Sequence, residues 1–373
     1  MSQVEILGMI GVNKERDASR GVTVSLFGGG INPADEIPAG IDPDYIAEFS
    51  QAHEASGFDK VLIGYSSATA EGFGVAGYAA SQTKTLGFLI AHRPGFVAPT
   101  LTARQAATLD QLTKGRIAMH FISGGSDVEQ RRDGDWMDHD ARYRRTDEFM
   151  GILKRVWTET EPFDHKGEFY QFEQNLSEVR TYQQPHVPLY FGGASDVAKE
   201  VGAKRADIYA LWGEPLASIK EQIADIRARA AKYDRTIRFS VSVRPILGDT
   251  EDEAWERARG ILDRVKSSVG NTIGPGKPAR LQSEGSRRLL DFASQGDIHD
   301  KRLWMPIAAT TGAAGNTTAL VGTAEQVAES LLAYHQAGAD AFIIRGFDPM
   351  QDTIDWGKEL IPMVREGAAA LAK

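Results

Sequence analysis

Short apolar runs recur along the whole chain, and longer stretches with a helical spacing of apolar and polar residues separate them. The runs are rich in Val, Ile, Phe and Tyr, which is typical of buried strands. They predict eight strands, at Val4–Ile10, Phe58–Tyr65, Leu86–Arg93, Ile117–Ser123, Pro188–Gly193, Asp207–Trp212, Arg238–Leu247 and Ala341–Phe347. Between the strands the apolar spacing, as at Ile219, Ile223 and Ile226, predicts amphipathic helices.

Signals for helix ends agree with this alternation. Asp42 precedes a proline where a helix should begin, Thr323 and Gln326 have the spacing of a capping box, and Gly57 and Gly115 follow predicted helices. Strands that alternate with helices in this number favour a closed (β/α)8 barrel, the TIM-barrel fold, over a doubly wound sheet, which commonly has about five or six strands. We therefore predict that residues 1–373 form one barrel.

The connection between the last two predicted strands, residues 249–340, is much longer than the repeat needs. Its segment Ser267–Ser286 is rich in Gly, Pro and Ser, a composition that predicts a loop. Long inserted connections in compact domains are usually lids over a site or surface excursions. The sequence leaves both readings open for this lid-like region, and a lid would be mobile.

The charge balance and composition narrow the class of protein. The net charge of −9 argues against a general nucleic-acid surface, which needs clustered Lys and Arg. Without cysteine, the chain has neither disulfides nor thiolate chemistry. No apolar segment approaches the length of a membrane span, and the first residues lack the pattern of a secretion signal. A cytoplasmic protein without nucleic-acid or membrane partners is therefore expected.

Polar residues at the carboxyl ends of the predicted strands are the first candidates for chemistry, because the active site of a (β/α)8 barrel lies at those ends. The candidates found there are His92, Arg93, His120, Trp212, Ser242, Arg244, Arg345 and Phe347. No HExxH motif or other metal-ligand spacing is present, and neither are the GxSxG elbow and the GxxxxGK[ST] loop. A metal site, a serine hydrolase and a nucleotide triphosphatase all lose their usual support.

Three strand ends carry an arginine. In the seventh strand, alternation places Val241 and Val243 on the face toward the helices, so Arg244 should point into the barrel mouth. A single arginine at such a position is more often part of a structural ion pair. The convergence of Arg93, Arg244 and Arg345 on one mouth favours recognition of an anion.

The segment PLYFGGASDVAKEV predicts a strand, a tight turn and a helix start. Free backbone N–H groups, the helix dipole and the hydroxyl of Ser195 could together bind a phosphate. The alternative is an ordinary turn in which Ser195 only caps the helix. From these residues alone the capping reading is favoured.

Four strings carry a resemblance to a known family. They are HRPGFVAPTLTARQAATLDQLTKGR at 92–116, SGGSDVEQRRDGDWMDHDARYRRTDEF at 123–149, PHVPLYFGGASDVA at 185–198 and ALWGEP at 210–215. On these strings, and on weaker similarity at Ala319–Gly322 and Ile344–Pro349, the chain resembles the bacterial luciferase-like flavin monooxygenases, most closely their alkanesulfonate monooxygenase branch. The resemblance runs from about residue 40 to the carboxyl terminus.

This resemblance implies a barrel that binds reduced FMN, supplied by a separate NAD(P)H-dependent flavin reductase, and that uses O2. The most similar members oxidise the carbon next to a sulfonate and release sulfite and an aldehyde. Matched position by position, His120 stands where relatives often have a flavin-binding Asn, and Glu129 at another flavin-linked position. Tyr143 matches a tyrosine near the FMN phosphate, and Ala194 and Ser195 match the phosphate-binding turn. A homodimer or homotetramer is expected.

Departures from the family pattern concern the substrate. Ser242 and Arg244 stand where alkanesulfonate oxygenases have Arg and His, and Phe347 replaces a Tyr. An anionic organosulfonate remains the leading substrate, because Arg244 and Arg345 can supply the positive charge. Polar neighbours suit a hydroxylated or sugar-like sulfonate. We assign as catalytic candidates Arg244, Arg345, Trp212 and His92, and as substrate-binding candidates Arg93, Ser242 and Phe347.

Three alternatives stay open at this point. The same oxygenase chemistry could act on a sulfone or another carbon skeleton, for which the arginines would matter little. Related barrels bind a deazaflavin and transfer hydride. The third alternative is a barrel that binds or stores flavin without catalysis.

Overall fold

In the computed structural model, which describes residues 4–14, 40–272, 283–313 and 318–372, eight parallel strands form a closed ring. These strands are β1 (Glu5–Ile10), β2 (Lys60–Ile63), β3 (Gly87–His92), β4 (Ile117–Phe121), β7 (Leu189–Gly192), β8 (Ile208–Trp212), β9 (Arg238–Leu247) and β13 (Ala341–Ile344). Each pairs with the next in this order, and β13 pairs with β1. The predicted (β/α)8 TIM barrel is confirmed, and each predicted run contains one barrel strand.

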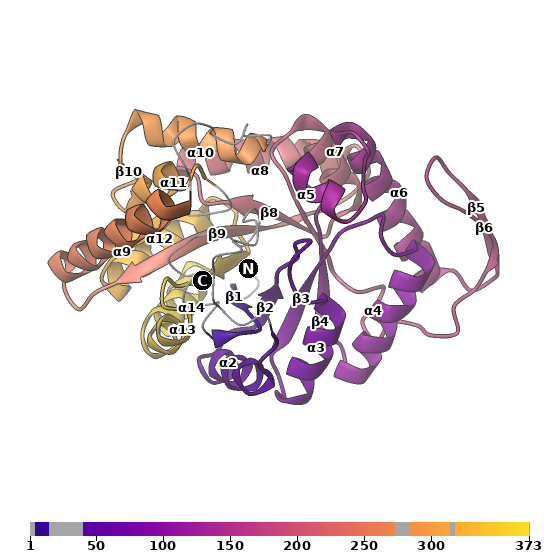
Figure 1. Cartoon of the computed structure of the whole chain (residues 1–373), viewed down its shortest axis with the longest axis horizontal. Coiled ribbons are helices and arrows are strands. Elements are labelled where there is room, and N and C mark those ends of the chain that lie inside the picture. The colour runs from indigo at the N-terminus through magenta and orange to yellow at the C-terminus, as the bar shows by residue number, and fades with distance from the viewer. Residues whose placement is uncertain (1–3, 15–39, 273–282, 314–317, 373) are drawn as a thin grey trace.

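Helices surround the ring (Figure 1). They are α2 (Pro43–Ala55), α3 (Gly72–Ser81), α4 (Pro99–Thr113), α6 (His139–Thr158), α7 (Asp196–Arg205), α8 (Leu216–Ala231), α12 (Ala324–Gln336), α13 (Pro349–Lys358) and α14 (Leu360–Leu371). The predicted signals for helix ends are confirmed at these residues. Asp42 caps α2, Thr323 and Gln326 form a capping box on α12, and Gly57 and Gly115 adopt positive φ angles after their helices.

Two apolar layers hold the barrel together. The outer layer packs the strands against the helices and includes Val241 and Val243 of β9. The inner layer fills the barrel; it contains Leu7, Met9, Leu62, Leu89, Ala91, Ala118, Tyr190, Ile208, Ala341 and Ile343. Because successive residues of a strand face opposite sides, Ser242 and Arg244 lie on the inner side of β9. The predicted alternation of β9 is confirmed.

The long connection after β9 is an ordered insertion in its described parts. It contains α9 (Glu251–Thr272), α10 (Glu284–Gln295), β10 (Ile298–His299), β11 (Leu303–Trp304), α11 (Pro306–Thr310) and β12 (Ala319–Gly322). The second half of β9 pairs with β12, and its first half pairs with β13. The predicted loop Ser267–Ser286 is wrong at both ends, because α9 runs to Thr272 and α10 begins at Glu284. Residues 273–282 lie outside the described ranges.

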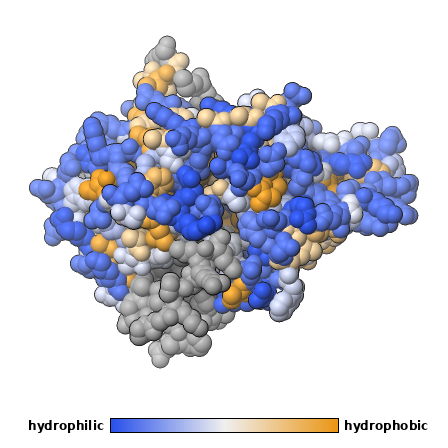
Figure 2. Space-filling view, turned by 90° about the horizontal axis from the view of Figure 1, so that it is seen from above, coloured by the Kyte–Doolittle hydropathy of each residue, from blue (hydrophilic) through white to orange (hydrophobic). Residues whose placement is uncertain are grey.

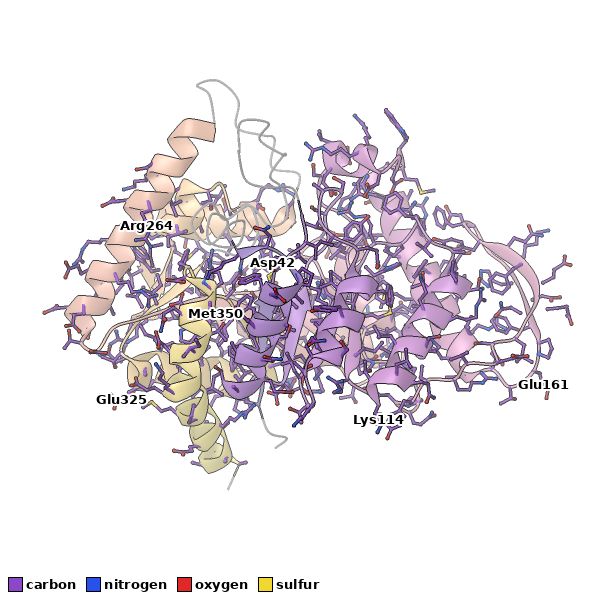
Figure 3. All side chains as sticks on the ribbon, turned by 60° about the horizontal axis from the view of Figure 1, so that its bottom comes forward. Asp42, Lys114, Glu161, Arg264, Glu325 and Met350 are labelled. Atoms are coloured by element: carbon purple, nitrogen blue, oxygen red, sulfur yellow. The ribbon has the colours of Figure 1, made fainter. Side chains whose placement is uncertain are left out.

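Two smaller excursions lie on the other side of the barrel. After β4 comes the short helix α5 (Asp127–Arg132), and after α6 comes the hairpin of β5 (Phe163–Lys166) and β6 (Gln171–Asn175). The hairpin and α9 lie at opposite ends of the molecule, where Figure 3 labels Glu161 and Arg264. The face drawn in Figure 2 is mostly hydrophilic, with scattered apolar residues. Within the described ranges, no helix combines the length and apolar character that crossing a membrane requires.

Candidate active site

The turn between β7 and α7 forms a backbone cradle. Ser195 is the N-cap of α7, and its Oγ accepts a hydrogen bond from the backbone N–H of Ala198 at 3.4 Å. A Cβ atom at Gly193 would lie 2.5 Å from the Cβ of Ala198, and one at Gly192 would lie 2.7 Å from the carbonyl oxygen of Ala210. Only glycine fits at both positions. The tight turn therefore brings backbone N–H groups and a helix N-terminus together, an arrangement that suits an anion.

Tyr143 reaches this cradle from α6. Its hydroxyl lies 3.3 Å from the position of a Cβ at Gly193, and Ser195 is near enough to influence its pKa. The ring is buried and packs edge-on against Phe191, with 6.1 Å between ring centroids. Burial raises the pKa of Tyr143, and the Ser195 side chain opposes this shift. The hydroxyl therefore stays protonated near neutral pH and can donate to an anion.

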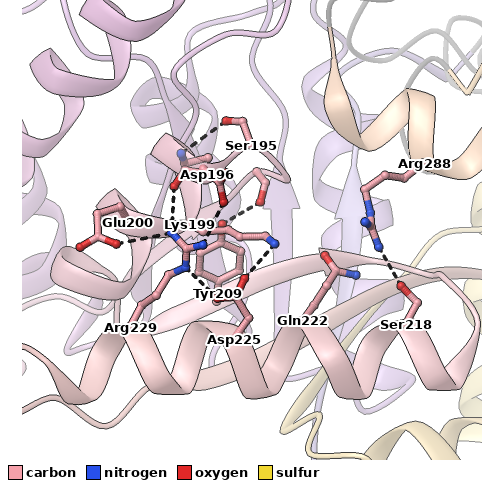
Figure 4. Close-up of polar contacts among 12 residues, drawn as sticks. Ser195, Asp196, Lys199, Glu200, Tyr209, Ser218, Gln222, Asp225, Arg229 and Arg288 are labelled. Carbon is pink, nitrogen blue, oxygen red and sulfur yellow. Dashed lines mark hydrogen bonds and ion pairs between the residues drawn. The ribbon is translucent and has the colours of Figure 1, made fainter.

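Ion pairs behind α7 fix the cradle to α8 (Figure 4). Arg229 of α8 bonds Asp196 at 2.9 Å and Asp225 at 2.8 Å, and Lys199 of α7 bonds Asp225 at 2.9 Å. Beneath the turn, the hydroxyl of Tyr209 donates to the carbonyl oxygen of Gly193 at 2.7 Å. These cations already have carboxylate partners, so the cradle itself consists of backbone and hydroxyl groups.

His120 lies on β4 between Ala91 of β3 and Tyr190 of β7, its neighbours in the sheet register. Its Nδ1 atom is buried and has no hydrogen-bond partner among the described residues. Burial lowers the pKa of His120 to about 4. The ring is therefore neutral near pH 7, with a nitrogen that a bound molecule could satisfy.

Arg93 lies in a compensated cluster rather than beside the other arginines. Its Nη1 is 2.5 Å from Oε2 of Glu129 and 3.7 Å from Oδ2 of Asp133, and its guanidinium carbon is 4.6 Å from the Tyr65 ring centroid. Tyr65 donates its hydroxyl proton to Asp133 at 2.8 Å. The other oxygen of Glu129 accepts the backbone N–H of Ser67 at 2.7 Å. Arg93 thus has the structural ion pair that is common for a strand-end arginine, and Glu129 is its partner.

Arg244 and Arg345 do come together. Arg244 is buried, its Nη2 donates to the carbonyl oxygen of Gly346 at 2.6 Å, and its Nε donates to that of Arg345 at 3.2 Å. Its guanidinium carbon lies 3.5 Å from the centroid of the Phe347 ring. Burial first, and then the positive charge of Arg345, lower the pKa of Arg244 well below its ordinary value, whereas the Asp352 carboxylate opposes the shift. This is a positively charged, desolvated corner of the mouth.

Trp212, the last residue of β8, is the register partner of Ser242 in the middle of β9. The Trp212 ring lies 3.0 Å from the position of a Cβ at Gly285, so the start of α10 rests on the end of β8. Ser283, the N-cap of α10, lies 3.7 Å from the position of a Cβ at Gly125, in the segment after β4. The described part of the insertion therefore reaches across from β8 to the β4 side of the mouth.

Two of the predicted site residues are not at the surface of the arginine corner: His92 lies away from it, and Phe347 lies inside the core. His92 packs on the outer side of β3 against Phe121 and Phe149, with ring centroids 5.9 and 5.5 Å apart, and its Nε2 is 3.5 Å from the Thr102 hydroxyl. Phe347 is 3% exposed and belongs to the apolar core of the insertion, so one ring face supports Arg244. The structure does not bring His92 together with Arg244 and Arg345.

Comparison with known proteins identifies the family. A sequence model described as luciferase-like monooxygenase matches residues 22–341, which is most of the chain. The chain belongs to this family. Luciferase-like monooxygenases are enzymes, and the barrel with its candidate residues at the carboxyl ends of the strands agrees with the site position that the fold predicts.

Solved structures similar to this luciferase-like monooxygenase share its fold. A riboflavin lyase, RcaE, solved with modified FMN and riboflavin, has a TM-score of 0.77 and 19% identity, and the match covers 98% of this chain and 92% of the other. DmoA from Hyphomicrobium sulfonivorans has a TM-score of 0.74 and 19% identity over 98% and 88% of the two chains. An F420-dependent secondary alcohol dehydrogenase has a TM-score of 0.66 and 14% identity over 97% and 99%.

Several residues around the mouth of this luciferase-like monooxygenase were not predicted from the sequence. Asp352 of α13 compensates Arg244, and Tyr65 and Asp133 contact Arg93, whereas Arg257 of α9 pairs with Asp352. They lie beyond strand ends or inside helices, where charged residues are usually solvated surface, and no local signal marks them. Among the described residues, no group of His, Asp or Glu side chains is placed to hold a metal ion.

Proposed function

We propose that this protein is a two-component flavin monooxygenase that uses reduced FMN and O2 to oxidise an anionic organosulfonate, with release of sulfite and an aldehyde. A separate NAD(P)H-dependent reductase would supply the reduced FMN. The observation that carries the substrate assignment is the pair Arg244 and Arg345 at the barrel mouth, with Arg244 fully buried.

The residues present fit FMN. The turn at Gly193 and Ser195, with the Tyr143 hydroxyl, offers neutral donors of the kind that hold a phosphate group. The unpartnered Nδ1 of His120 lies on the inner side of β4, where a flavin ring at the mouth could satisfy it. Reduced FMN, when bound, supplies the electrons with which O2 is activated. The protein itself would hold and orient the flavin and the substrate, and it would exclude water from the site.

The two arginines at this mouth are suited to pair with a sulfonate. A sulfonate keeps its charge near neutral pH, and entry into a low-dielectric pocket requires donors that pair with it. Burial and the charge of Arg345 disfavour the protonated form of Arg244. An anion bound between the two arginines would stabilise the charged forms of both. Trp212 and the start of α10 cover the adjoining strand ends and would exclude water there.

A substrate screen tests this function. Organosulfonates, including hydroxylated and sugar-like ones, would be incubated with the protein, FMN, a flavin reductase, NAD(P)H and air, and released sulfite would be measured. We expect sulfite and an aldehyde in equal amounts from at least one sulfonate. Oxygen consumption without sulfite from any sulfonate, together with turnover of a neutral sulfone, would reject the anionic substrate and retain the oxygenase.

A second candidate is a deazaflavin-dependent oxidoreductase. It is supported by the likeness of this fold to an F420-dependent alcohol dehydrogenase and by His120 in place of the flavin-binding Asn of the relatives. Such an enzyme would transfer hydride without consuming oxygen. Substrate-dependent oxygen consumption with reduced FMN, measured beside hydride transfer from the reduced deazaflavin, separates the two candidates.

A further inference from the structure

The turn after β13 holds Arg244 from one side. The carbonyl oxygens of Arg345 and Gly346 accept hydrogen bonds from its Nε and Nη2, and Phe347 lies under its guanidinium. The position of the arginine therefore depends on the position of this three-residue turn, which lies 101 to 102 residues away in the sequence.

Asp352 holds the same turn from the other side. Its Oδ2 accepts the backbone N–H of Phe347 at 2.8 Å and that of Asp348 at 2.9 Å, and the side chain is buried. A Cβ at Gly346 would lie 2.2 Å from this oxygen. The carboxylate thus packs directly on the turn, and no side chain fits between them. Its negative charge also opposes the two influences that lower the pKa of Arg244.

The second oxygen of Asp352 is held by the insertion. Arg257 of α9 forms an ion pair with Oδ1 of Asp352, and its Nη1 donates to the carbonyl oxygen of Leu247 at 3.1 Å, at the end of β9. Arg257 therefore joins the inserted helix to the turn and to the strand that carries Arg244. Loss of the cationic partner of a buried carboxylate leaves the negative charge uncompensated, which is strongly destabilising.

From this arrangement we infer that Asp352, held by Arg257, is a positioning residue that fixes Arg244 for binding of the substrate anion. The inference rests on the proposed function for its substrate and on contacts within the protein for its geometry. Selection of an anionic substrate would then depend on a helix of the insertion that does not itself reach the substrate.

The first test does not depend on any substrate. In protein with 15N-labelled arginine side chains, the Nε–H signal of Arg244 can be assigned by its loss in Arg244→Lys. We expect Asp352→Asn to increase hydrogen exchange at this Nε–H by on the order of tenfold. The matched control is Asp355→Asn in the same helix, which removes an exposed partner of Lys358 and should leave the signal unchanged. An unchanged Arg244 signal in Asp352→Asn overturns the inference.

The second test uses turnover. With an organosulfonate that the enzyme oxidises, Asp352→Asn should lower kcat/KM by on the order of tenfold, through KM, without changing FMN affinity. Arg257→Met keeps Asp352 and should shift both readouts in the same direction by a smaller factor, and it decides the matter where Asp352→Asn does not fold. If no sulfonate is a substrate, the proposed function fails, and the exchange measurement still judges the positioning role.

Discussion

The two sides of the barrel mouth consist of different chemical groups. On the side of β7 and α7, the glycine backbone and the Ser195 hydroxyl of one turn form a neutral cradle, which the Tyr143 hydroxyl joins from α6. On the side of β9 and β13, the buried Arg244 is held by residues far away in the sequence. The first side depends on local backbone shape, whereas the second depends on charge and on packing between distant elements. Each side should therefore respond to a different kind of change.

The largest effect is expected on the charged side. Arg244→Met and Arg345→Met should each lower kcat/KM for an anionic substrate, with a loss of transition-state stabilisation of about 2–5 kcal/mol. The reason is that the anion would enter a desolvated site with one donor too few. FMN affinity should change little. The measurement is steady-state kinetics together with flavin binding.

A control for this prediction lies on the same strand. Arg238 begins β9 at the opposite end of the barrel and pairs with Glu5 at 3.2 Å, so Arg238→Met should leave kcat/KM unchanged. Normal kcat/KM in both mouth variants would make Arg244 and Arg345 structural, and the charged side would lose its role in substrate binding.

The neutral side predicts a smaller effect with the opposite selectivity. Ser195→Ala combined with Tyr143→Phe should weaken FMN binding by roughly 1.5–3 kcal/mol, at least about tenfold, because hydrogen bonds to a charged phosphate are lost. Riboflavin, which lacks the phosphate, should bind equally well to both proteins. Thr323→Ala removes another helix N-cap far from the cradle and serves as the control. Equal losses for FMN and riboflavin would contradict a phosphate role for the cradle.

The same contrast explains how far the sequence could be interpreted. The barrel was predictable because each strand is a continuous apolar run, and the turn at the cradle because GGAS directly precedes a helix, although the residues alone favoured a capping role for Ser195. In contrast, β10 and β11 are only two residues long and carry no periodicity. The partners of the arginines were unpredictable for another reason. Glu129 next to Arg93, or Asp352 next to Arg244, follows from three-dimensional packing between elements, which no local pattern encodes.

His120, on the strand next to β7 of the cradle side, provides a test of charge through pH. Burial lowers the pKa of His120 to about 4, so the folded protein keeps the ring neutral while the unfolded chain binds a proton near pH 6.5. The stability from this group is complete above about pH 6.5 and is lost as pH falls toward 4, about 2 kcal/mol of it by about pH 5. His53 and His92, whose pKa values are also lowered to about 4 by burial, should contribute in the same way.

Chemical denaturation at about pH 7 and about pH 5 measures this loss for the wild type and for His120→Asn. The variant should lose about 2 kcal/mol less between the two pH values, whatever its stability at neutral pH. The same loss in both proteins would mean that folding does not lower the pKa of His120 and that the ring is charged at about pH 5. The cofactor side would then carry a positive charge, and the contrast between the two sides would weaken.

The smallest effect is expected for Arg229, which lies behind the cradle without forming part of it. Its partner Asp196 is 88% exposed, and partly exposed ion pairs of this kind contribute only about 0–1 kcal/mol. Arg229→Met should therefore change FMN affinity by less than about fivefold, and the affinity of the wild type should fall little when salt is raised from about 0.05 to 0.5 M. Flavin titrations with FMN and riboflavin at both salt concentrations provide the comparison. A large, salt-sensitive loss confined to FMN would show that charge from α8 holds the phosphate, and the cofactor side would then work by the same physics as the arginine side.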